Sequence, residues 1–386
     1  MLAATESQHY RAASLDSPGT VAVHEYERQP VLDTDAVVEI EMCGVCGSDV
    51  HWVHANEVGQ AQIPYPFDLG HEWVGRVVEK GSAVPSHDLA GELVDVGDRV
   101  WVMRAPCGKC YACAVLRHHE ACIGRPSMLT LPAEQRRVRG WGFADIHHAA
   151  STDGDLSFVK VAEHVAAEAA VLLEPLTNAL TAIERSMQGG APQAGIGYGP
   201  GATVVVQGAG PIGALIACVA RLTGADRIIV VGAPANRLEL VKDLAADEVI
   251  NIEEVTDPDE RVELVREMTP HGLGPDVVYE AAGVPIAWIE ALQMVRQFGT
   301  IVEVGHFTPR DPIPFDPFLI CSKACSIYGH YGLSNQAWVT AAKFLARHWP
   351  AMRIDRLVTN VYPLDQLPEA IENMRRGVDL KAAIRP

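Results

Sequence analysis

A glycine-rich turn between an apolar strand and a helix constrains the fold of this chain more than any other stretch. Residues 203–213 read TVVVQGAGPIG, in which three valines are followed by glycines at the GxGxxG spacing. A strand that is apolar on both faces belongs in the middle of a parallel sheet. The glycines permit a tight turn, a close approach of a pyrophosphate, and close packing of the next helix. The candidate dinucleotide-binding residues here are Gly208, Gly210, Pro211, Ile212 and Gly213.

The chain after this turn repeats the same pattern of apolar strand and helix. Runs at 227–231 and 248–250 predict two more strands, with a helix over 237–245 between them. Two successive strand–helix–strand steps predict an α/β fold with a doubly wound parallel sheet. Further strands are expected at 276–280, 300–304 and 326–328, with a helix over 286–298 before the second of these. Gly305 then follows a strand at the carboxyl edge of the sheet, where ligands bind in open α/β folds.

Length, composition and charge limit what else the chain can be. At 386 residues, with 48% hydrophobic and 21% charged residues, it should form two soluble globular domains. A net charge of -18 argues against a nucleic-acid partner or an anionic membrane surface. Residues 1–6 show no signal peptide, and no apolar run reaches the roughly 18 residues of a membrane span. We therefore expect a cytoplasmic protein without a membrane partner.

The first chemical cluster combines thiols, an imidazole and carboxylates. Residues 43–51 read CGVCGSDVH, and GHE follows at 70–72. A thiolate, an imidazole and a carboxylate suit Zn²⁺, and three protein ligands with one open position are typical of a catalytic site. Taken singly, Cys46 could be a buried thiol and His71 a core residue. Their occurrence together with the glycine-rich turn favours a metal site.

A second cluster contains only cysteines. Residues 107–113 read CGKCYAC, and a fourth cysteine follows at 122, so that Cys107, Cys110, Cys113 and Cys122 form the set. Four thiolates offered by a tight loop and a return suit a closed tetrahedral zinc site. An iron–sulfur or redox role is the alternative. Nine cysteines, mostly before residue 123, fit metal binding in a reducing compartment better than a disulfide framework.

A carboxylate in an apolar setting follows at Glu174, within LLEPL at 172–176. Burying it without a partner is costly, and a metal ion would be such a partner. We expect helical segments at 163–171 and 177–187. Residues 191–201, with four glycines and two prolines, are expected to link the two domains.

Together, these motifs resemble the zinc-dependent medium-chain alcohol dehydrogenase family over nearly the whole chain. The Glu174-Pro175-Leu176 motif resembles the polyol, threonine and glucose dehydrogenase branches. The resemblance implies a mainly β, GroES-like catalytic zinc domain at 1–177, completed by 337–386. It also implies an NAD(P)-binding Rossmann domain at 178–336.

The resemblance also implies roles for single residues. Cys46 and His71 would bind the catalytic zinc, with Glu174 and Glu72 as third ligand and exchanging or neighbouring carboxylate. Ser48 and His51 would relay protons, and Asp49 would orient His71, as metal-bound imidazoles require. The four clustered cysteines would hold a second, structural zinc, giving two per chain. Lys381 resembles the basic residue that reaches the cofactor pyrophosphate.

The activity implied is reversible oxidation of an alcohol to a ketone or aldehyde. Zinc would lower the pKa of the alcohol, and NAD(P) would accept the hydride. The expected partners are a small-molecule alcohol or carbonyl, preferably a secondary or cyclic alcohol, and copies of the chain in a homodimer or homotetramer. The alternative is a zinc-stabilised NAD(P)-binding protein, or a zinc-free reductase of the same fold, without this turnover.

Three features depart from the family pattern. Eight residues separate Cys113 from Cys122 instead of seven. The segment 82–98 is longer than the family's loop at this place, and the run 128–141 has no recognisable counterpart in the family. Both long segments are expected to shape the substrate entrance or oligomer contacts. The second strand of the glycine-turn domain is followed by Gly232 instead of an acid for the ribose 2′-OH, with Arg237 further on. We expect NAD to be preferred over NADP only weakly, and Gly232→Asp to sharpen that preference.

Overall fold

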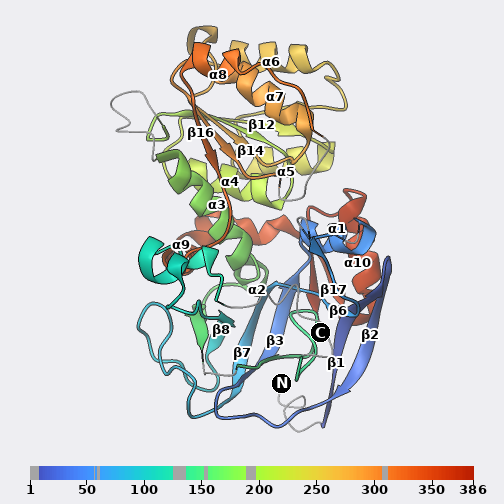
Figure 1. The fold of residues 1–386 in the computed structure, drawn as a ribbon. Helices are drawn as coiled ribbons and strands as arrows, with labels where there is room; N and C mark the ends of the chain where they lie inside the picture. The colour runs from blue at the N-terminus through green and yellow to red at the C-terminus, as the bar shows by residue number, and fades with distance from the viewer. Residues whose placement is uncertain are drawn as a thin grey trace. The chain divides into compact units, whose positions relative to one another are not determined.

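The computed structural model describes residues 8–55, 57–58, 61–124, 136–151, 155–187, 197–306 and 312–386 (Figure 1). The chain divides into two compact units. The first comprises 1–174, 332–349 and 358–386, and the second 175–331 and 350–357. The chain therefore crosses between the units several times. Within the described residues, no helix is long and apolar enough to cross a membrane.

The first unit is built mainly from antiparallel strands. One sheet has the order β10-β8-β7-β3-β18-β17, with β9 paired to β3, and a second has the order β2-β1-β6. The strands are β1 (His9–Ser17), β2 (Thr20–Glu27), β3 (Ala36–Gly44), β4 (Glu57–Val58), β5 (Ala61–Gln62), β6 (Phe67–Asp68), β7 (Glu72–Lys80), β8 (Arg99–Arg104), β9 (Ile146–Ala149), β10 (Leu156–Lys160), β17 (Val358–Pro363) and β18 (Lys381–Arg385).

Helices are short or peripheral in this unit. They are α1 (Gly47–Ala55), α2 (Ala167–Ala170) and α10 (Leu367–Arg375), with α9 (Asn335–Met352) leading out of the unit and turns η1 (Ala112–Leu116), η2 (His119–Ala121) and η8 (Leu364–Gln366). The helix α10 packs against α1 and β18.

Antiparallel pairing of β3 with β7 brings the two halves of the first chemical cluster together. In this pairing Gly44 at the end of β3 lies opposite Glu72 at the start of β7. On its other edge β3 pairs with β18, so that Gly44 lies opposite Ala383. The loop after β3, the loop before β7 and the C-terminal strand therefore converge on one place, although up to about 340 residues of sequence separate them.

The second unit is the predicted α/β layer structure. Its six parallel strands have the order β13-β12-β11-β14-β15-β16, which is that of a doubly wound dinucleotide-binding sheet. The strands are β11 (Thr203–Gln207), β12 (Arg227–Gly232), β13 (Glu248–Asn251), β14 (Val277–Glu280), β15 (Thr300–Glu303) and β16 (Ser326–Gly329). The helices are α3 (Leu173–Ser186), α4 (Pro211–Leu222), α5 (Ala235–Leu244), α6 (Pro258–Glu267), α7 (Pro285–Met294) and α8 (Phe318–Lys323), with turns η6 (Pro270–Gly272) and η7 (Ile354–Leu357).

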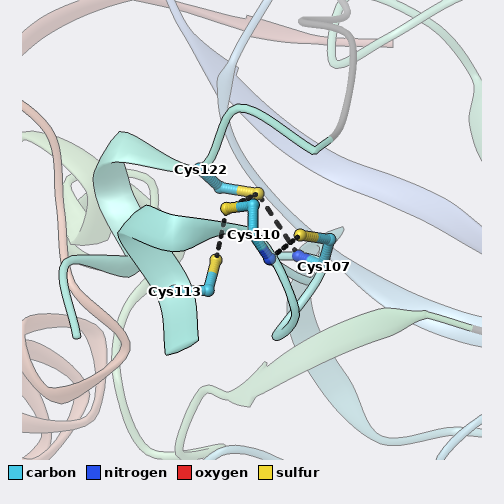
Figure 2. Close-up of side chains that lie close together, drawn as sticks. All are labelled: Cys107, Cys110, Cys113 and Cys122. Carbon is cyan, nitrogen blue, oxygen red and sulfur yellow. Dashed lines mark hydrogen bonds between the residues drawn. The ribbon is translucent and has the colours of Figure 1, made fainter. Parts of the chain in front are cut away.

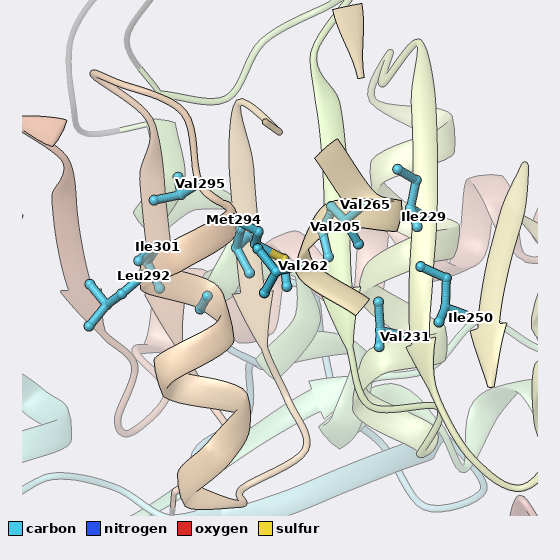
Figure 3. Packing of buried hydrophobic residues seen from close by; sticks show 12 residues of the cluster. Val205, Ile229, Val231, Ile250, Val262, Val265, Leu292, Met294, Val295 and Ile301 are labelled. Carbon is cyan, nitrogen blue, oxygen red and sulfur yellow. The ribbon is translucent and has the colours of Figure 1, made fainter. Parts of the chain in front are cut away.

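Both faces of this parallel sheet are covered. On one face, alternate strand residues such as Val205 and Ile229 pack with Val262, Val265 and Leu292 of α6 and α7 (Figure 3). The intervening residues, Val204 and Val206 among them, are equally buried. Successive strand residues face opposite sides, so helices must shield the second face too. This explains the unbroken apolar run that precedes the glycines.

Several element boundaries differ from the sequence analysis. The helical segment expected at 163–171 is present only as the short α2 (Ala167–Ala170). The helix α3 begins at Leu173 and passes through Pro175, whereas the sequence analysis started it at 177; proline is tolerated in a first turn because its missing N–H has no helical partner there. The helix α7 ends at Met294, short of the predicted 298. Most of 128–141 and of the 191–201 linker lies outside the described residues.

Candidate active site

The first chemical cluster forms one compact group of potential metal ligands. One ligand atom each from Cys46, His71 and Glu72 lies within 4.8 Å of the other two. Gly44 leaves room for this group, because a Cβ there would lie only 2.7 Å from Glu72 Oε2. The predicted approach of Cys46 to His71 is thus present in the structure.

The helix α1 carries three further predicted residues beside this group. The Oγ of Ser48 lies 3.3 Å from His71 Nε2. The carboxylate of Asp49 is fully buried, accepts a 2.8 Å hydrogen bond from the Cys46 N–H, and has its Oδ1 3.8 Å from His71 Nδ1. His51 follows on the same helix and is partly exposed. The arrangement suits an orienting role for Asp49, which stays a prediction because 3.8 Å is too long for a hydrogen bond.

Lys381 lies beside the candidate metal ligands and not at the surface. Its side chain is 1% exposed, and its Nζ forms an ion pair with the equally buried Glu72. Burial lowers the pKa of Lys381, but the negative charges of Glu72, Cys46 and Glu174 and the hydrogen bond with Glu72 together raise it overall. The position of β18 beside β3 explains the contact. The predicted contact of Lys381 with a pyrophosphate stays a prediction.

Glu174 stands in the first turn of α3, close to the cluster but, among the described residues, not part of the compact group. Its negative charge contributes to raising the pKa of both His71 and Lys381. The sequence analysis offered both Glu72 and Glu174 as the third zinc ligand. In this structure Glu72 is the one that lies in the compact group with Cys46 and His71.

The cluster fits a zinc ion by its chemistry and by its unsatisfied groups. Thiolate, imidazole and carboxylate are the donor types that zinc prefers. Within the described part of the chain, Asp49 Oδ1 and His71 Nδ1 are buried without a hydrogen-bond partner. Burial raises the pKa of the Cys46 thiol. Burial alone would lower the pKa of His71, but the charges of Cys46, Asp49 and Glu174 and the hydrogen bond with Cys46 together raise it to about 10. The raised pKa values mean that both Cys46 and His71 hold a proton more firmly. A bound metal ion requires deprotonated ligands and would displace these protons.

Two aromatic residues that the sequence analysis missed flank the imidazole. The centroid of the Trp52 ring lies 5.3 Å from that of the His71 ring, and the centroid of the Trp141 ring lies 5.8 Å from it. Trp52 follows Ser48 by four residues on α1, a spacing that places both on one helix face. That spacing was available from the sequence. The approach of Trp141 was not, because it comes from a distant loop.

The four clustered cysteines also come together as predicted (Figure 2). One sulfur from each of the four lies within 4.8 Å of the others, with the Cys110 and Cys113 sulfurs 3.4 Å apart. Backbone N–H groups lower the pKa of Cys110 to about 6, which favours the thiolate. The turns η1 and η2 lie between Cys110 and Cys122. Gly124 is required, since a Cβ there would lie 2.3 Å from the Cys107 sulfur.

The glycine-rich turn has the geometry of a dinucleotide site. Gly208 has φ +104°, and a Cβ on Gly213 would lie 2.0 Å from the Gly208 carbonyl oxygen. A Cβ on Gly210 would meet nothing within 4 Å, so this glycine faces open space. Pro211 and Ile212 open α4, whose first N–H groups can hold a phosphate.

The remaining predicted cofactor residues lie along the same sheet edge. Gly232 ends β12 and is buried, and Arg237 is partly buried on α5. Gly305 follows β15, and a Cβ on it would lie 2.5 Å from Glu280 Oε2.

A third group of titratable residues, which the sequence analysis did not identify, surrounds Gly305. Glu280 and Glu303 end neighbouring strands in register, and His306 Nδ1 lies 3.2 Å and 3.0 Å from their carboxylates. Burial, followed by the charge of Glu303, raises the pKa of Glu280 to about 9.

Comparisons with known proteins agree with this geometry. Residues 32–172 match the model of the alcohol dehydrogenase GroES-like domain, and residues 211–347 match that of zinc-binding dehydrogenases. The chain is 31% identical over 382 residues to 5-exo-hydroxycamphor dehydrogenase of Pseudomonas putida, covering 98% of this chain and 99% of the other. The chain belongs to the zinc-dependent medium-chain alcohol dehydrogenase family.

Other relatives lie in the polyol and threonine dehydrogenase branches of this family. Sorbitol dehydrogenase of Bacillus subtilis is 28% identical, covering 95% of this chain and 94% of the other, and L-threonine 3-dehydrogenase of Pyrococcus furiosus is 32% identical, covering 89% and 88%. An alcohol dehydrogenase from Thermotoga maritima has a similar structure, with a TM-score of 0.86, 28% identity, and coverage of 98% and 100%.

Family membership confirms the predicted fold class and reaction class. This zinc-dependent dehydrogenase pairs a GroES-like domain with a Rossmann domain and oxidises an alcohol with NAD(P). Nothing in these relatives favours the alternative of a zinc-free or non-catalytic protein.

Proposed function

We propose that this dehydrogenase oxidises a secondary or cyclic alcohol at the site of Cys46, His71 and Glu72, with Glu174 as an exchanging carboxylate. The observation that carries the proposal is the convergence of three different ligand types within 4.8 Å, with buried polar atoms left unsatisfied around them. When bound, zinc supplies a Lewis acid for the alcohol oxygen, and the oxidised nicotinamide accepts the hydride.

Side chains of α1 can accept and transfer the proton that the alcohol loses. The Ser48 hydroxyl, 3.3 Å from His71 Nε2, lies beside the ligand group and can accept that proton. His51 is on the same helix and partly exposed, so it can pass the proton to solvent. Lys381 holds the Glu72 carboxylate and limits its negative charge at the site.

Metal analysis and two matched variants test the assignment. The wild type should contain two zinc ions per chain, Cys46→Ser only the structural one, and Cys110→Ser only the catalytic one. Cys46→Ser should lose at least about a thousandfold in kcat/KM, or about 4 kcal/mol, and still bind reduced cofactor in a fluorescence titration. Substantial alcohol oxidation by a Cys46→Ser protein free of catalytic zinc would contradict the proposal.

For the cofactor, we propose NAD ahead of NADP by about tenfold in kcat/KM, or about 1.4 kcal/mol. The support is the absence of both an acid and a fork-shaped arginine at Gly232 and the next two positions. A zinc-binding dehydrogenase structure from Sinorhizobium meliloti, 25% identical with a TM-score of 0.80, is bound to NADP. Measuring kcat/KM with NAD and with NADP under the same conditions tests this proposal. An NADP preference above about a hundredfold would contradict it.

The expectation for Gly232→Asp needs correction. A Cβ at Gly232 would lie 2.8 Å from the backbone nitrogen of Ala209, inside the glycine-rich turn. The backbone of this turn must shift to admit any side chain. We therefore expect Gly232→Asp to weaken binding of both dinucleotides instead of sharpening the NAD preference.

We further propose a cytoplasmic homodimer or homotetramer. All nine cysteines are free, which suits a reducing compartment. The strand β16 is a sheet edge, and Phe298 and Phe318 of the same unit are more than half exposed. Light scattering after size-exclusion chromatography measures the mass directly, and a monomer at micromolar concentration would contradict the oligomer.

A further inference from the structure

Aromatic side chains form the wall of the candidate active site next to His71. Trp52 and Trp141 flank the imidazole, and Phe67 packs edge-on against Trp52 with 5.2 Å between ring centroids. Given the proposed zinc site, on which this inference rests, we propose that the wall selects an apolar ring over a polyol. Trp141 is the specificity-determining residue.

A cavity borders this wall within the same unit. Its volume is about 310 Å³. Apolar side chains such as Trp141, Phe67 and Leu156 line it, together with polar ones that include Arg104, His147 and Ser151. Pockets of this size and apolar character hold small molecules with few polar groups. Because Trp141 both contacts the His71 ring and lines the cavity, it connects the reacting centre with the space for the body of a substrate.

The arginines of the segment before Trp141 are engaged with buried carboxylates. Arg136 donates to Asp68 at 3.1 Å, and Arg137 forms an ion pair with the fully buried Asp35. Arg139, from the same segment, donates to Asp68 at 2.7 Å. The three arginines of the long segment before Trp141 therefore anchor it to the unit. They are poorly placed to serve the hydroxyls of a polyol.

The consequence for specificity follows from the cost of burying hydroxyls. A buried hydroxyl without a partner lowers binding by a factor of roughly 10 to 100. A polyol would bring several such groups to the aromatic wall, whereas an apolar ring brings none beyond the reacting one. The preference is thus a property of the wall, and is independent of the metal ligands.

Cyclohexanol and myo-inositol provide a matched test, because they share one ring and differ only in hydroxyls. We expect kcat/KM for cyclohexanol to exceed that for myo-inositol by at least about a hundredfold. Binding of each is measured in parallel by quenching of protein fluorescence, which needs no turnover. Cyclohexanol bound tightly but not oxidised would contradict the proposed function and leave this inference standing. Equal or better use of myo-inositol would overturn the inference and leave the function standing.

Variants of Trp141 test its role directly. Trp141→Ala should raise KM for cyclohexanol about tenfold with kcat changed less than about threefold, since the wall binds ground state and transition state alike. Trp141→Phe should retain most of the preference. Zinc content and melting temperature, measured for both, show that the fold is intact. An unchanged KM and an unchanged substrate ratio in Trp141→Ala would overturn the assignment.

Discussion

Single buried charges set the chemistry around Cys46 and His71. Glu72 and Lys381 are each 1% exposed and face one another beside the ligand group. Two charges are stable there only as a pair, because the desolvation of either alone would cost several kcal/mol. The pair therefore links the C-terminal strand to the stability of the metal site.

This coupling predicts a metal-dependent effect of Lys381→Met. In protein freed of zinc, the variant should lose about 3–5 kcal/mol of unfolding free energy, because Glu72 is left buried and unpaired. With zinc bound, the loss should be smaller, since the cation then compensates the carboxylate. Denaturant titrations with and without zinc measure both values. Adding Glu72→Gln should restore part of the loss, and an equal loss in both metal states would refute the coupling.

At the scale of elements, the glycines of the turn between β11 and α4 have different roles. Gly213 is needed for packing, because a Cβ there would lie 2.0 Å from a backbone oxygen. Gly210 is sterically free, because a Cβ there would contact nothing within 4 Å. The same motif thus contains one position required by the fold and one kept open for the ligand.

We expect Gly213→Ala and Gly210→Ala to separate these roles. Gly213→Ala should lower the unfolding free energy by about 1–3 kcal/mol, in excess of the about 1 kcal/mol gained in helix propensity. Gly210→Ala should keep the melting temperature and weaken dinucleotide binding about tenfold or more, because the methyl group occupies the side from which the pyrophosphate approaches. Thermal melts and fluorescence titrations test the pair. Tight dinucleotide binding by Gly210→Ala would show that the phosphate does not approach there.

At the scale of the whole molecule, buried titratable groups set how stability depends on pH. Burial lowers the pKa of His147 and of His330 to about 4, so the folded chain keeps both imidazoles neutral. The unfolded chain takes up protons below its histidine pKa of about 6.5, and stability falls as the pH drops from there toward 4. Glu280 acts in the opposite sense, since its pKa is raised to about 9.

Glu280 predicts a loss of stability on the alkaline side. Between its unfolded pKa of about 4.3 and its folded pKa of about 9, the folded state binds more protons, so the unfolding free energy falls as the pH rises. Glu280→Gln keeps an acceptor for the Ala282 and Gly283 N–H groups but cannot ionise. The melting temperature of the variant, relative to wild type, should therefore increase steadily from pH 5 to pH 9. A constant difference across this range would contradict the raised pKa.

Local patterns were sufficient for most of the fold. The apolar runs of the second unit predicted its strands to within a residue or two, because a strand buried on both faces must be apolar throughout. The spacing of Cys107, Cys110, Cys113 and Cys122 predicted their cluster, since the ligands lie within one short loop. The chemistry of their side chains and the family resemblance predicted that Cys46 and His71 lie at one metal site.

Contacts between distant segments were decided only by the tertiary structure. Lys381 reaches Glu72 because β18 pairs with β3, and no local pattern records which strands pair. Trp141 reaches His71 from a loop, where periodicity carries no information about direction. The burial of Gly232 against Ala209 likewise depends on how strand and turn pack. The sequence by itself determined which chemistry this chain carries and which layers it forms. The tertiary structure decided which side chains surround that chemistry, because pairing and packing join residues far apart in the chain.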